Sequence, residues 1–99
     1  MLDMAQKAVD ALKGKSRLQF DQDEILKTAV SHFIQTIGEA ASKVSKGFKE
    51  QNPNIPWDDI IGMRHKIVHD YMTVDFDIVW DAVKTELPPL LEKLKKIAI

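Results

Sequence analysis

Apolar residues recur at helical spacing from the start of the chain. Three or four positions separate successive members of a first set, Met1, Met4, Ala5, Ala8 and Leu12. This spacing is typical of one buried face of an α-helix. Gly14 follows the set, where a helix commonly ends in a left-handed residue. The pattern predicts a first helix that ends near Lys13.

A longer apolar stripe occupies the middle of the chain. Its members are Ile25, Ala29, Phe33, Ile37, Ala40, Ala41 and Val44, broadened by Leu26, Val30 and Ile34. Asp21 precedes the stripe and can cap a helix while Glu24 reaches back to it, as in a capping box. Gly47 follows the stripe and supplies a stop. We therefore expect a long central helix between Asp21 and Gly47.

The segment 48–56 interrupts the helical pattern. It reads FKEQNPNIP, with two prolines and two asparagines, and this composition is typical of a loop. Trp57 opens the next apolar stripe, and Asp58 and Asp59 follow it, where carboxylates favour the positive end of a helix dipole. The pattern predicts a third helix from Trp57 to about Tyr71.

A fourth helix is expected after Asp75, whose side chain can cap it. The apolar positions of this helix are Phe76, Val79, Trp80, Val83 and Leu87. Pro88 and Pro89 then force a kink or a restart into the sequence LLEKLKKIAI. The short connections favour antiparallel neighbours. The prediction is one all-α domain over residues 1–99, an up-and-down four-helix bundle with a kinked or additional C-terminal helix.

Composition narrows the classes of protein. Ninety-nine residues exclude an enzyme with separate cofactor and substrate domains, and so small a core favours self-association. Fourteen basic against 15 acidic residues give a net charge of −1, which argues against a polybasic coat for nucleic acid. The absence of cysteine removes disulfides, thiolate zinc sites and cysteine nucleophiles. Charges interrupt every apolar run near the N-terminus, so we expect a cytoplasmic protein without a membrane span.

One charged residue stands inside the third apolar stripe. Trp57, Arg64 and Tyr71 fall on one line of an ideal helix. Because arginine keeps its charge, Arg64 needs an acidic partner, a water-filled cleft or an anionic ligand. A purely structural interpretation pairs Arg64 with Glu39 or Asp70. A functional interpretation gives it an anion to bind, and helical geometry leaves both open.

His69 is separated from Arg64 by about 140° around an ideal helix. The two side chains converge only if the helix ends or loosens near His69, or if two copies of the helix meet across a dimer axis. His65 and His69 have the i, i+4 spacing of metal ligands, but Asp70 alone follows as a candidate third ligand. We therefore expect no metal site. His32, in the second stripe, is expected to be a partly exposed structural residue.

Three segments resemble the HepT-like branch of the HEPN superfamily: IGEAA at 37–41, NIPWDDIIGMRHKIVHDY at 54–71 and VDFDIVWDAVKTELPPLL at 74–91. HEPN ribonucleases carry an Arg followed four to six residues later by a His, as Arg64 and His69 are here. HepT-like members add a Tyr two residues after the His, which Tyr71 matches. His65 stands where many relatives carry Asn, although polar residues are usual at that position.

The resemblance implies an all-helical, HEPN-like homodimer that cuts RNA as a toxin of a type II toxin-antitoxin system, without metal or cofactor. It implies catalytic roles for Arg64 and His69 in a cleft of the dimer, with His65, Glu39 and Asp70 as possible supporting residues. It also implies a partner, an MNT-type nucleotidyltransferase antitoxin that transfers AMP to Tyr71. A guanidinium suits phosphate binding and an imidazole suits proton transfer near neutral pH.

An alternative function belongs to a different class. A catalytically silent HEPN dimer would serve as a nucleotide-binding or regulatory partner of a nucleotidyltransferase, with Arg64 holding a phosphate. This alternative leaves His69 without a role. A bundle whose polar residues are only structural is the third interpretation, and in it Tyr71 is a core residue with its hydroxyl at the rim.

Overall fold

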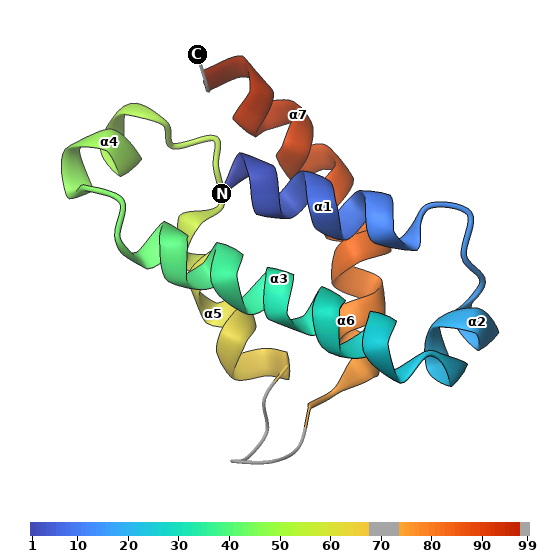
Figure 1. The fold of residues 1–99 in the computed structure, drawn as a ribbon. Coiled ribbons are helices and arrows are strands. Elements are labelled where there is room, and N and C mark those ends of the chain that lie inside the picture. Colours follow the sequence, from blue (N-terminus) through green and yellow to red (C-terminus); the bar gives the residue numbers. More distant parts are fainter. Residues whose placement is uncertain (68–73, 98–99) are drawn as a thin grey trace.

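The computed structural model describes residues 1–67 and 74–97, and in them the chain is an all-α protein (Figure 1). Its elements are α1 (Leu2–Leu12), α2 (Arg17–Gln22), α3 (Glu24–Ser42), α4 (Lys46–Gln51), α5 (Trp57–Ile67), α6 (Phe76–Asp81), a π-helical turn η1 (Ala82–Glu86) and α7 (Leu87–Ile97). Within the described ranges, no helix has the length and apolar character needed to cross a lipid bilayer.

The long helix α3 is the centre of the bundle. It packs against α5 on one side and against α1 on the other, and α1 in turn packs against α7. Figure 1 shows α1 and α3 running antiparallel, with the continuous α6–η1–α7 rod crossing behind them. The four rods are therefore α1, α3, α5 and α6–η1–α7, which confirms the predicted all-α bundle, with the C-terminal helix α7 continuing the fourth rod.

The core is built from the inward faces of all four rods. Its members are Ala5, Ala8, Leu12, Phe20, Val30, Ile34, Ile37, Ala41, Ile55, Trp57, Ile60, Ile67, Val79, Ala82, Val83, Leu87, Leu90, Leu91 and Leu94. The inward face of α3 differs from the expected stripe at its start, because Ile25 is 84% exposed. The buried line of α3 instead runs through the positions predicted to broaden the stripe, Val30 and Ile34, and on to Ile37 and Ala41.

Two predicted helix boundaries are confirmed. Helix α1 ends at Leu12, Lys13 is its C-terminal cap, and Gly14 adopts a φ of 74° that favours glycine. Helix α6 begins after Asp75, whose carboxylate accepts hydrogen bonds from the backbone N–H groups of Asp77 (3.0 Å) and Ile78 (3.3 Å). These caps were predictable because each residue type satisfies a local backbone requirement.

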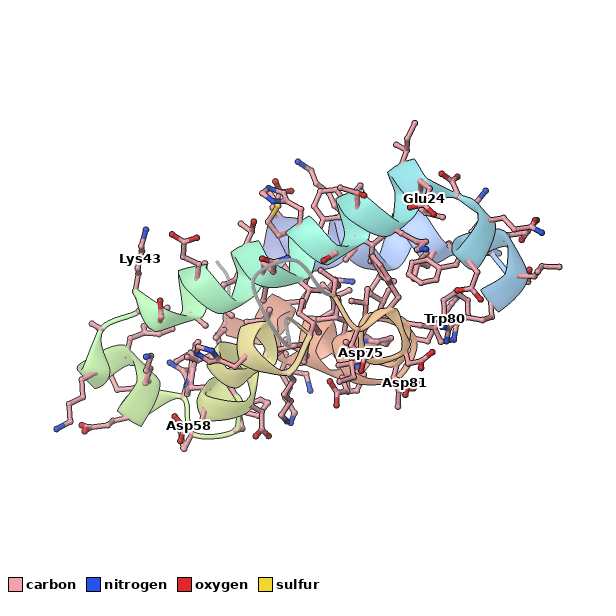
Figure 2. The ribbon with its side chains drawn as sticks, turned by 90° about the horizontal axis from the view of Figure 1, so that it is seen from below. Glu24, Lys43, Asp58, Asp75, Trp80 and Asp81 are labelled. Carbon is pink, nitrogen blue, oxygen red and sulfur yellow. The ribbon has the colours of Figure 1, made fainter. Side chains whose placement is uncertain are left out.

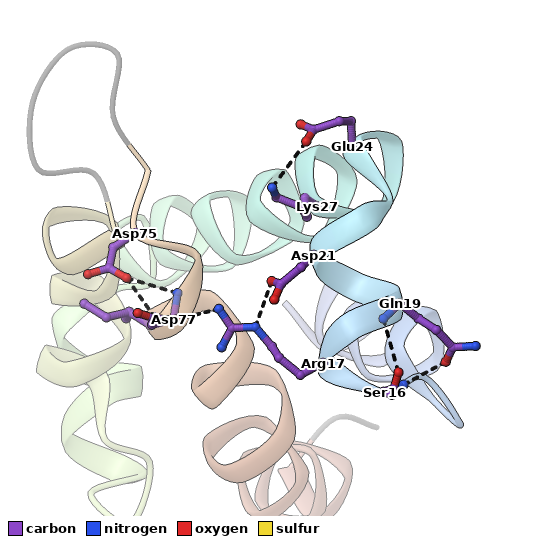
Figure 3. Close-up of polar contacts among 9 residues, drawn as sticks. Ser16, Arg17, Gln19, Asp21, Glu24, Lys27, Asp75 and Asp77 are labelled. Atoms are coloured by element: carbon purple, nitrogen blue, oxygen red, sulfur yellow. Dashed lines mark hydrogen bonds and ion pairs between the residues drawn. The ribbon is translucent and has the colours of Figure 1, made fainter.

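The predicted cap of the central helix was wrong by two residues. Asp23, not Asp21, caps α3 by accepting from the backbone N–H of Leu26 at 3.0 Å. Asp21 lies within the extra helix α2, where it binds Arg17 at 2.8 Å (Figure 3). Helix α2 begins at a capping box in which Ser16 and Gln19 exchange side-chain and backbone hydrogen bonds.

The predicted role of Gly47 as a stop was also wrong. Helix α3 ends at Ser42, five residues earlier, and Gly47 lies inside the short helix α4. Ser45 begins that helix by accepting from the backbone N–H of Phe48 at 3.2 Å. The first residues of the expected loop 48–56 are therefore helical.

The two prolines do not break the last rod. Pro88 and Pro89 lie in the first turn of α7, directly after the π-helical turn. In that turn the backbone N–H of Leu87 donates to the carbonyl of Ala82, five residues back. Because proline lacks an N–H and its ring crowds the preceding turn, the wider π-turn accommodates both rings while the rod continues.

Candidate functional site

Helix α5 is held at its start by aromatic contacts and a hydrogen bond. The indole Nε1 of Trp57 donates to the backbone carbonyl of Asn52 at 3.0 Å. The ring of Phe48, from α4, meets the Trp57 ring edge to face, with 6.3 Å between centroids. Asp58 and Asp59 stand exposed in the first turn, where they complement the helix dipole. These contacts fix the direction of α5 relative to α4.

The structure places position 64 on the inward side of α5. Trp57, Ile60 and Ile67 are buried against the rest of the bundle, with exposures of 8%, 5% and 0%. On a regular helix, position 64 lies about 20° from Trp57 and about 40° from Ile60, within the arc that these residues define. The arginine therefore stands at a core-facing position. The side chain of Arg64 lies outside the described part of the structure.

The end of α5 is joined to the start of α6. The backbone N–H of Asp75 donates to the carbonyl of Ile67, the last residue of α5, at 2.6 Å. Since the carboxylate of Asp75 also caps α6 (Figure 3), one residue ties the two helix ends together. His69, Asp70 and Tyr71 belong to the interval between these ends, and they lie outside the described residues.

Two further histidines are placed by the structure. His65 is exposed on α5, one position after Arg64. His32 is exposed on α3, with its Nε2 atom 3.5 Å from the hydroxyl of Thr36. His32 is thus a surface residue, as expected. Among residues 1–67 and 74–97, no group of three or more histidine or carboxylate side chains is arranged to hold a metal ion.

Glu39, the proposed acidic partner of Arg64, has a cationic neighbour on its own helix. Its carboxylate lies 3.3 Å from the ammonium group of Lys43, and its side chain is about half exposed. Lys43 projects from the end of α3 into solvent (Figure 2). The structure therefore places Glu39 in a surface ion pair, of a kind that contributes little to stability.

A groove between α3, α5 and α7 was not predicted from the sequence. It encloses about 380 Å³. Its apolar floor is formed by Ile34, Ile37, Ile60, Met63, Leu87 and Leu90, and charged residues stand at its rim, Asp59, Lys66, Glu86 and Lys93. The groove lies where α5 packs on α3 and α7 packs on α1, while α5 and α7 do not pack closely against each other. No local sequence signal reports such a gap between distant helices.

Comparison with known proteins identifies the family. The family model described as "Ribonuclease HepT-like" matches residues 1–97. A protein named "Putative RNase TTE0752", from Caldanaerobacter subterraneus subsp. tengcongensis, is 35% identical over 90% of this chain and 80% of its own length. "Putative RNase MJ1216" of Methanocaldococcus jannaschii is 32% identical over 98% of this chain and 80% of its own length.

A third relative carries the family's name. "Probable ribonuclease HepT" of Thermococcus cleftensis is 36% identical over 76% of this chain and 68% of its own length. Among solved structures, none matches the chain. The match over almost the whole chain agrees with the helical fold and with the motif of Arg64, His69 and Tyr71 in the sequence. The chain belongs to the HepT-like ribonuclease family of the HEPN superfamily.

Proposed function

We propose that this protein is a metal-independent endoribonuclease that acts on RNA as a homodimer. The observation that carries the proposal is the match of almost the whole chain to a ribonuclease family, together with the presence of Arg64 and His69 at the spacing of that family's motif. His69 follows the last residue of α5 by two positions in the sequence. The interval that contains His69 is anchored at both ends by the Ile67–Asp75 hydrogen bond.

Arg64 and His69 have different roles in the proposed reaction: Arg64 stabilises charge and His69 transfers a proton. The guanidinium of Arg64 binds the scissile phosphate and stabilises the charge that grows on it in the transition state. The imidazole of His69 accepts the proton of the ribose 2′-hydroxyl, or donates one to the leaving oxygen. The 2′-oxygen forms a bond to phosphorus as the bond to the 5′-oxygen breaks. The products are a 2′,3′-cyclic phosphate and a 5′-hydroxyl.

RNA thus supplies its own nucleophile, which explains why the chemistry needs no cysteine and no metal-bound water. DNA lacks the 2′-hydroxyl and is expected to resist cleavage. His65, exposed beside Arg64, and the acids Glu39 and Asp70 are the residues that we assign to supporting roles.

The proposed biological setting is a type II toxin-antitoxin system. In it, an MNT-type nucleotidyltransferase serves as antitoxin and transfers AMP to the hydroxyl of Tyr71. The bond between the α-phosphate and pyrophosphate of ATP breaks as the bond to the phenolic oxygen forms. A phosphodiester close to Arg64 would compete with the RNA backbone for the guanidinium.

The test is cleavage of mixed RNA by the purified protein in the presence of EDTA, followed by analysis of the product ends. We expect cleavage with 2′,3′-cyclic phosphate ends. His69→Ala is expected to lower the rate about 10²- to 10⁴-fold while RNA binding persists. His32→Ala, the same change at an exposed position of α3, is the matched control and should cut at the wild-type rate.

Three results would contradict the proposal. They are loss of cleavage in EDTA, wild-type cleavage by His69→Ala, and absence of cleavage of any RNA by a folded dimer. The last result, together with nucleotide binding that depends on Arg64, would favour a catalytically silent partner of a nucleotidyltransferase.

A further inference from the structure

Four polar residues form a line along one flank of α3. Lys27, Ser31, Gln35 and Glu39 follow one another at intervals of four positions, so each lies about 40° further around the helix than the one before. We call this set the polar ridge. Ser31 is buried, Gln35 is half-buried and Glu39 is exposed. The polar ridge therefore passes from the interior of the bundle to its surface.

Ser31 holds the side chain of Gln35 in place. Among the residues that the structure describes, Ser31 carries the only buried polar side chain, with 4% exposure. Its hydroxyl oxygen accepts a hydrogen bond of 3.2 Å from the Nε2 atom of Gln35. Because the nitrogen and oxygen of an amide diverge, this bond directs Oε1 elsewhere. Within residues 1–67 and 74–97, no donor meets Oε1, so Gln35 presents an oriented acceptor that the fold does not use.

The polar ridge lies on the flank of α3 that faces α5 and the start of α6. The Nζ atom of Lys27 is 4.5 Å from the ring centroid of Phe76, the first residue of α6. Further along the flank, Gly38 is buried within about 20° of Ser31. The helix with which α3 makes its most extensive contacts is α5. Gln35, half-buried beside these covered positions, therefore stands at the edge of the contact between α3 and α5.

Gln35 also lies at the same height in the bundle as position 64. Figure 1 shows α5 turning back along α3 after the α4 corner, so the two helices run in opposite directions. Seven positions separate Gln35 from Ser42, the last residue of α3, and seven separate position 64 from Trp57, the first residue of α5. At 1.5 Å per residue, each position is about 10 Å from the corner. The acceptor thus lies beside the helix segment that carries the proposed phosphate-binding residue.

The chemistry of Oε1 limits its partners in RNA. An amide oxygen only accepts hydrogen bonds, and the phosphate oxygens of a nucleic acid also only accept them. Through this atom, Gln35 is therefore not a second phosphate contact. The donors that a nucleotide offers are the ribose 2′-hydroxyl and the amino and imino groups of the bases. Gln35 is suited to bind a nucleoside, next to a phosphate that another residue binds.

We propose that Gln35 contacts the substrate, with its Oε1 atom accepting a hydrogen bond from a nucleotide that flanks the scissile phosphate, and that Ser31 positions it. This inference rests on the proposed function, in which Arg64 binds the phosphate itself. The donor is the ribose 2′-hydroxyl or a base amino group. A site that hydrogen-bonds such a group rejects an analogue that lacks it, because the acceptor is then left unpaired. Gln35 is thus a specificity-determining residue of the ribonuclease.

The test combines changes in the protein with changes in the nucleic acid. The probes are labelled oligoadenylate, the DNA oligomer of the same sequence, which lacks the 2′-hydroxyl, and an RNA oligomer of purine riboside, which lacks the amino group. Fluorescence anisotropy gives each dissociation constant, with His69→Ala as the parent protein so that the RNA stays intact. We expect the parent to bind oligoadenylate about tenfold more tightly than one of the two analogues. That analogue identifies the donor, and adding Gln35→Leu should remove the preference.

Two further variants separate a contact with RNA from a role in packing. Gln35→Glu keeps an acceptor oxygen, so it should keep the preference of the parent, while its added negative charge weakens the binding of all three probes. Ser31→Ala removes the partner of Nε2 and frees the amide, so the preference should become smaller without vanishing. A purely structural role would instead lower the affinity for every probe by the same factor and leave the preference unchanged.

Gln6→Leu is the matched control. Gln6 is half-buried on α1, and its Nε2 atom donates to Oδ1 of Asp10, four positions further on, at 2.9 Å. The same change at a similar local arrangement on another helix should leave the preference of the parent intact. Circular dichroism of every variant confirms that the helices are formed.

The inference is overturned by a parent that binds the three probes equally or binds none of them, or by a Gln35→Leu variant that keeps the preference. Cleavage is scored separately in protein that retains His69, where Gln35→Leu should lower kcat/KM about tenfold. A protein that shows the preference but cuts no RNA would contradict the proposed chemistry alone. A protein that cuts RNA with no dependence on Gln35 would contradict this inference alone.

Discussion

At the scale of single residues, Arg64 is a charged residue in the apolar stripe of α5. The buried neighbours Trp57, Ile60 and Ile67 surround its position on the helix. A guanidinium offers five N–H donors in a rigid plane and keeps its charge at any relevant pH, whereas a lysine offers a single mobile ammonium group. The shape of the donor set, and not charge alone, therefore matters for the proposed phosphate contact.

Arg64→Lys tests this distinction. The variant keeps the positive charge but loses the paired hydrogen bonds, so we expect cleavage to fall by about 10²-fold or more while RNA binding weakens less. Single-turnover cleavage and fluorescence anisotropy with labelled RNA measure the two effects. Arg17→Lys, the same change on α2, is the control and should leave cleavage unchanged. Cleavage by the Arg64→Lys variant at the wild-type rate would remove the need for a guanidinium.

Arg17 itself shows what a structural arginine looks like in this protein. Its guanidinium binds Asp21 within α2 and Asp77 across the gap to α6 (Figure 3). The hydrogen bonds that Arg17 donates to Asp21 and Asp77 raise the pKa of its guanidinium above the usual value. It also lies 5.9 Å from the ring centroids of Phe20 and Trp80. Arg17 thus links α2 to α6 by charge and by contact with aromatic rings.

Residue-level prediction succeeded where one side chain meets one backbone requirement. Gly14 was recognised because a left-handed residue is needed after α1, and Asp75 because the first turn of α6 needs a hydrogen-bond acceptor. Prediction of the N-cap of α3 failed because two residues of the right type stand close together. Asp21 and Asp23 are both acceptable caps, and the choice depends on Arg17, which binds Asp21 within α2. Helix α2 is too short to show in the apolar pattern, so that pattern could not assign Asp21 to it.

At the scale of elements, the short helices were the hardest to predict. Helices α2 and α4 have six residues each, too few to display a periodic apolar face. A capping signal was nevertheless present. Ser16 and Gln19 have the spacing of a capping box, and Ser45 precedes α4 as an N-cap. Capping residues, read before periodicity, would have found both helices.

The start of α6 is the element boundary most closely tied to the candidate site. Asp75 caps α6 with its carboxylate and holds the end of α5 with its backbone N–H. Asp75→Ala removes the cap and is expected to lower the free energy of unfolding by about 1 kcal/mol. Asp75→Asn keeps an acceptor oxygen and should retain most of that stability. Asp81→Ala, at an exposed position at the end of α6, is the surface control.

Urea unfolding followed by circular dichroism measures these differences. An Asp75→Ala variant as stable as the wild type would show that the cap contributes nothing to folding.

At the scale of the whole molecule, neighbouring helices of the bundle pack closely except α5 and α7, which a groove separates. Contacts pass from α5 to α3, from α3 to α1 and from α1 to α7, while a groove separates α7 from α5. A tertiary link, from the ammonium group of Lys84 to the backbone carbonyl of Leu12 at 2.7 Å, fastens η1 to the end of α1. The all-α class and the four rods were predictable from periodicity, because each rod buries its own stripe. The groove depends on how distant rods are arranged, which periodicity does not encode.

The candidate site was recognised from the sequence by a different route from the fold. Helical geometry identified Arg64 as a charged residue in an apolar stripe, but it did not decide between an acidic partner and an anionic ligand. Only the family motif assigned a shared site to Arg64, His69 and Tyr71. The family match over residues 1–97 supports that motif at the level of a ribonuclease. The roles of the individual residues remain predictions, since His69 and Tyr71 lie outside the described part of the chain.

Regulation by a partner is the last prediction, and it concerns the protein in its cellular complex. If the nucleotidyltransferase antitoxin silences the protein by adding AMP to Tyr71, the phenolic oxygen is indispensable. Tyr71→Phe removes that oxygen but keeps the ring, so modification is separated from packing. We expect this variant to stay toxic in cells that also produce the antitoxin, whereas the wild type is neutralised. Mass spectrometry of the wild-type protein produced with its antitoxin should find AMP on the peptide that contains Tyr71. An unmodified peptide, together with a Tyr71→Phe variant that the antitoxin still neutralises, would assign inhibition to protein contact alone, because neither result requires an acceptor oxygen.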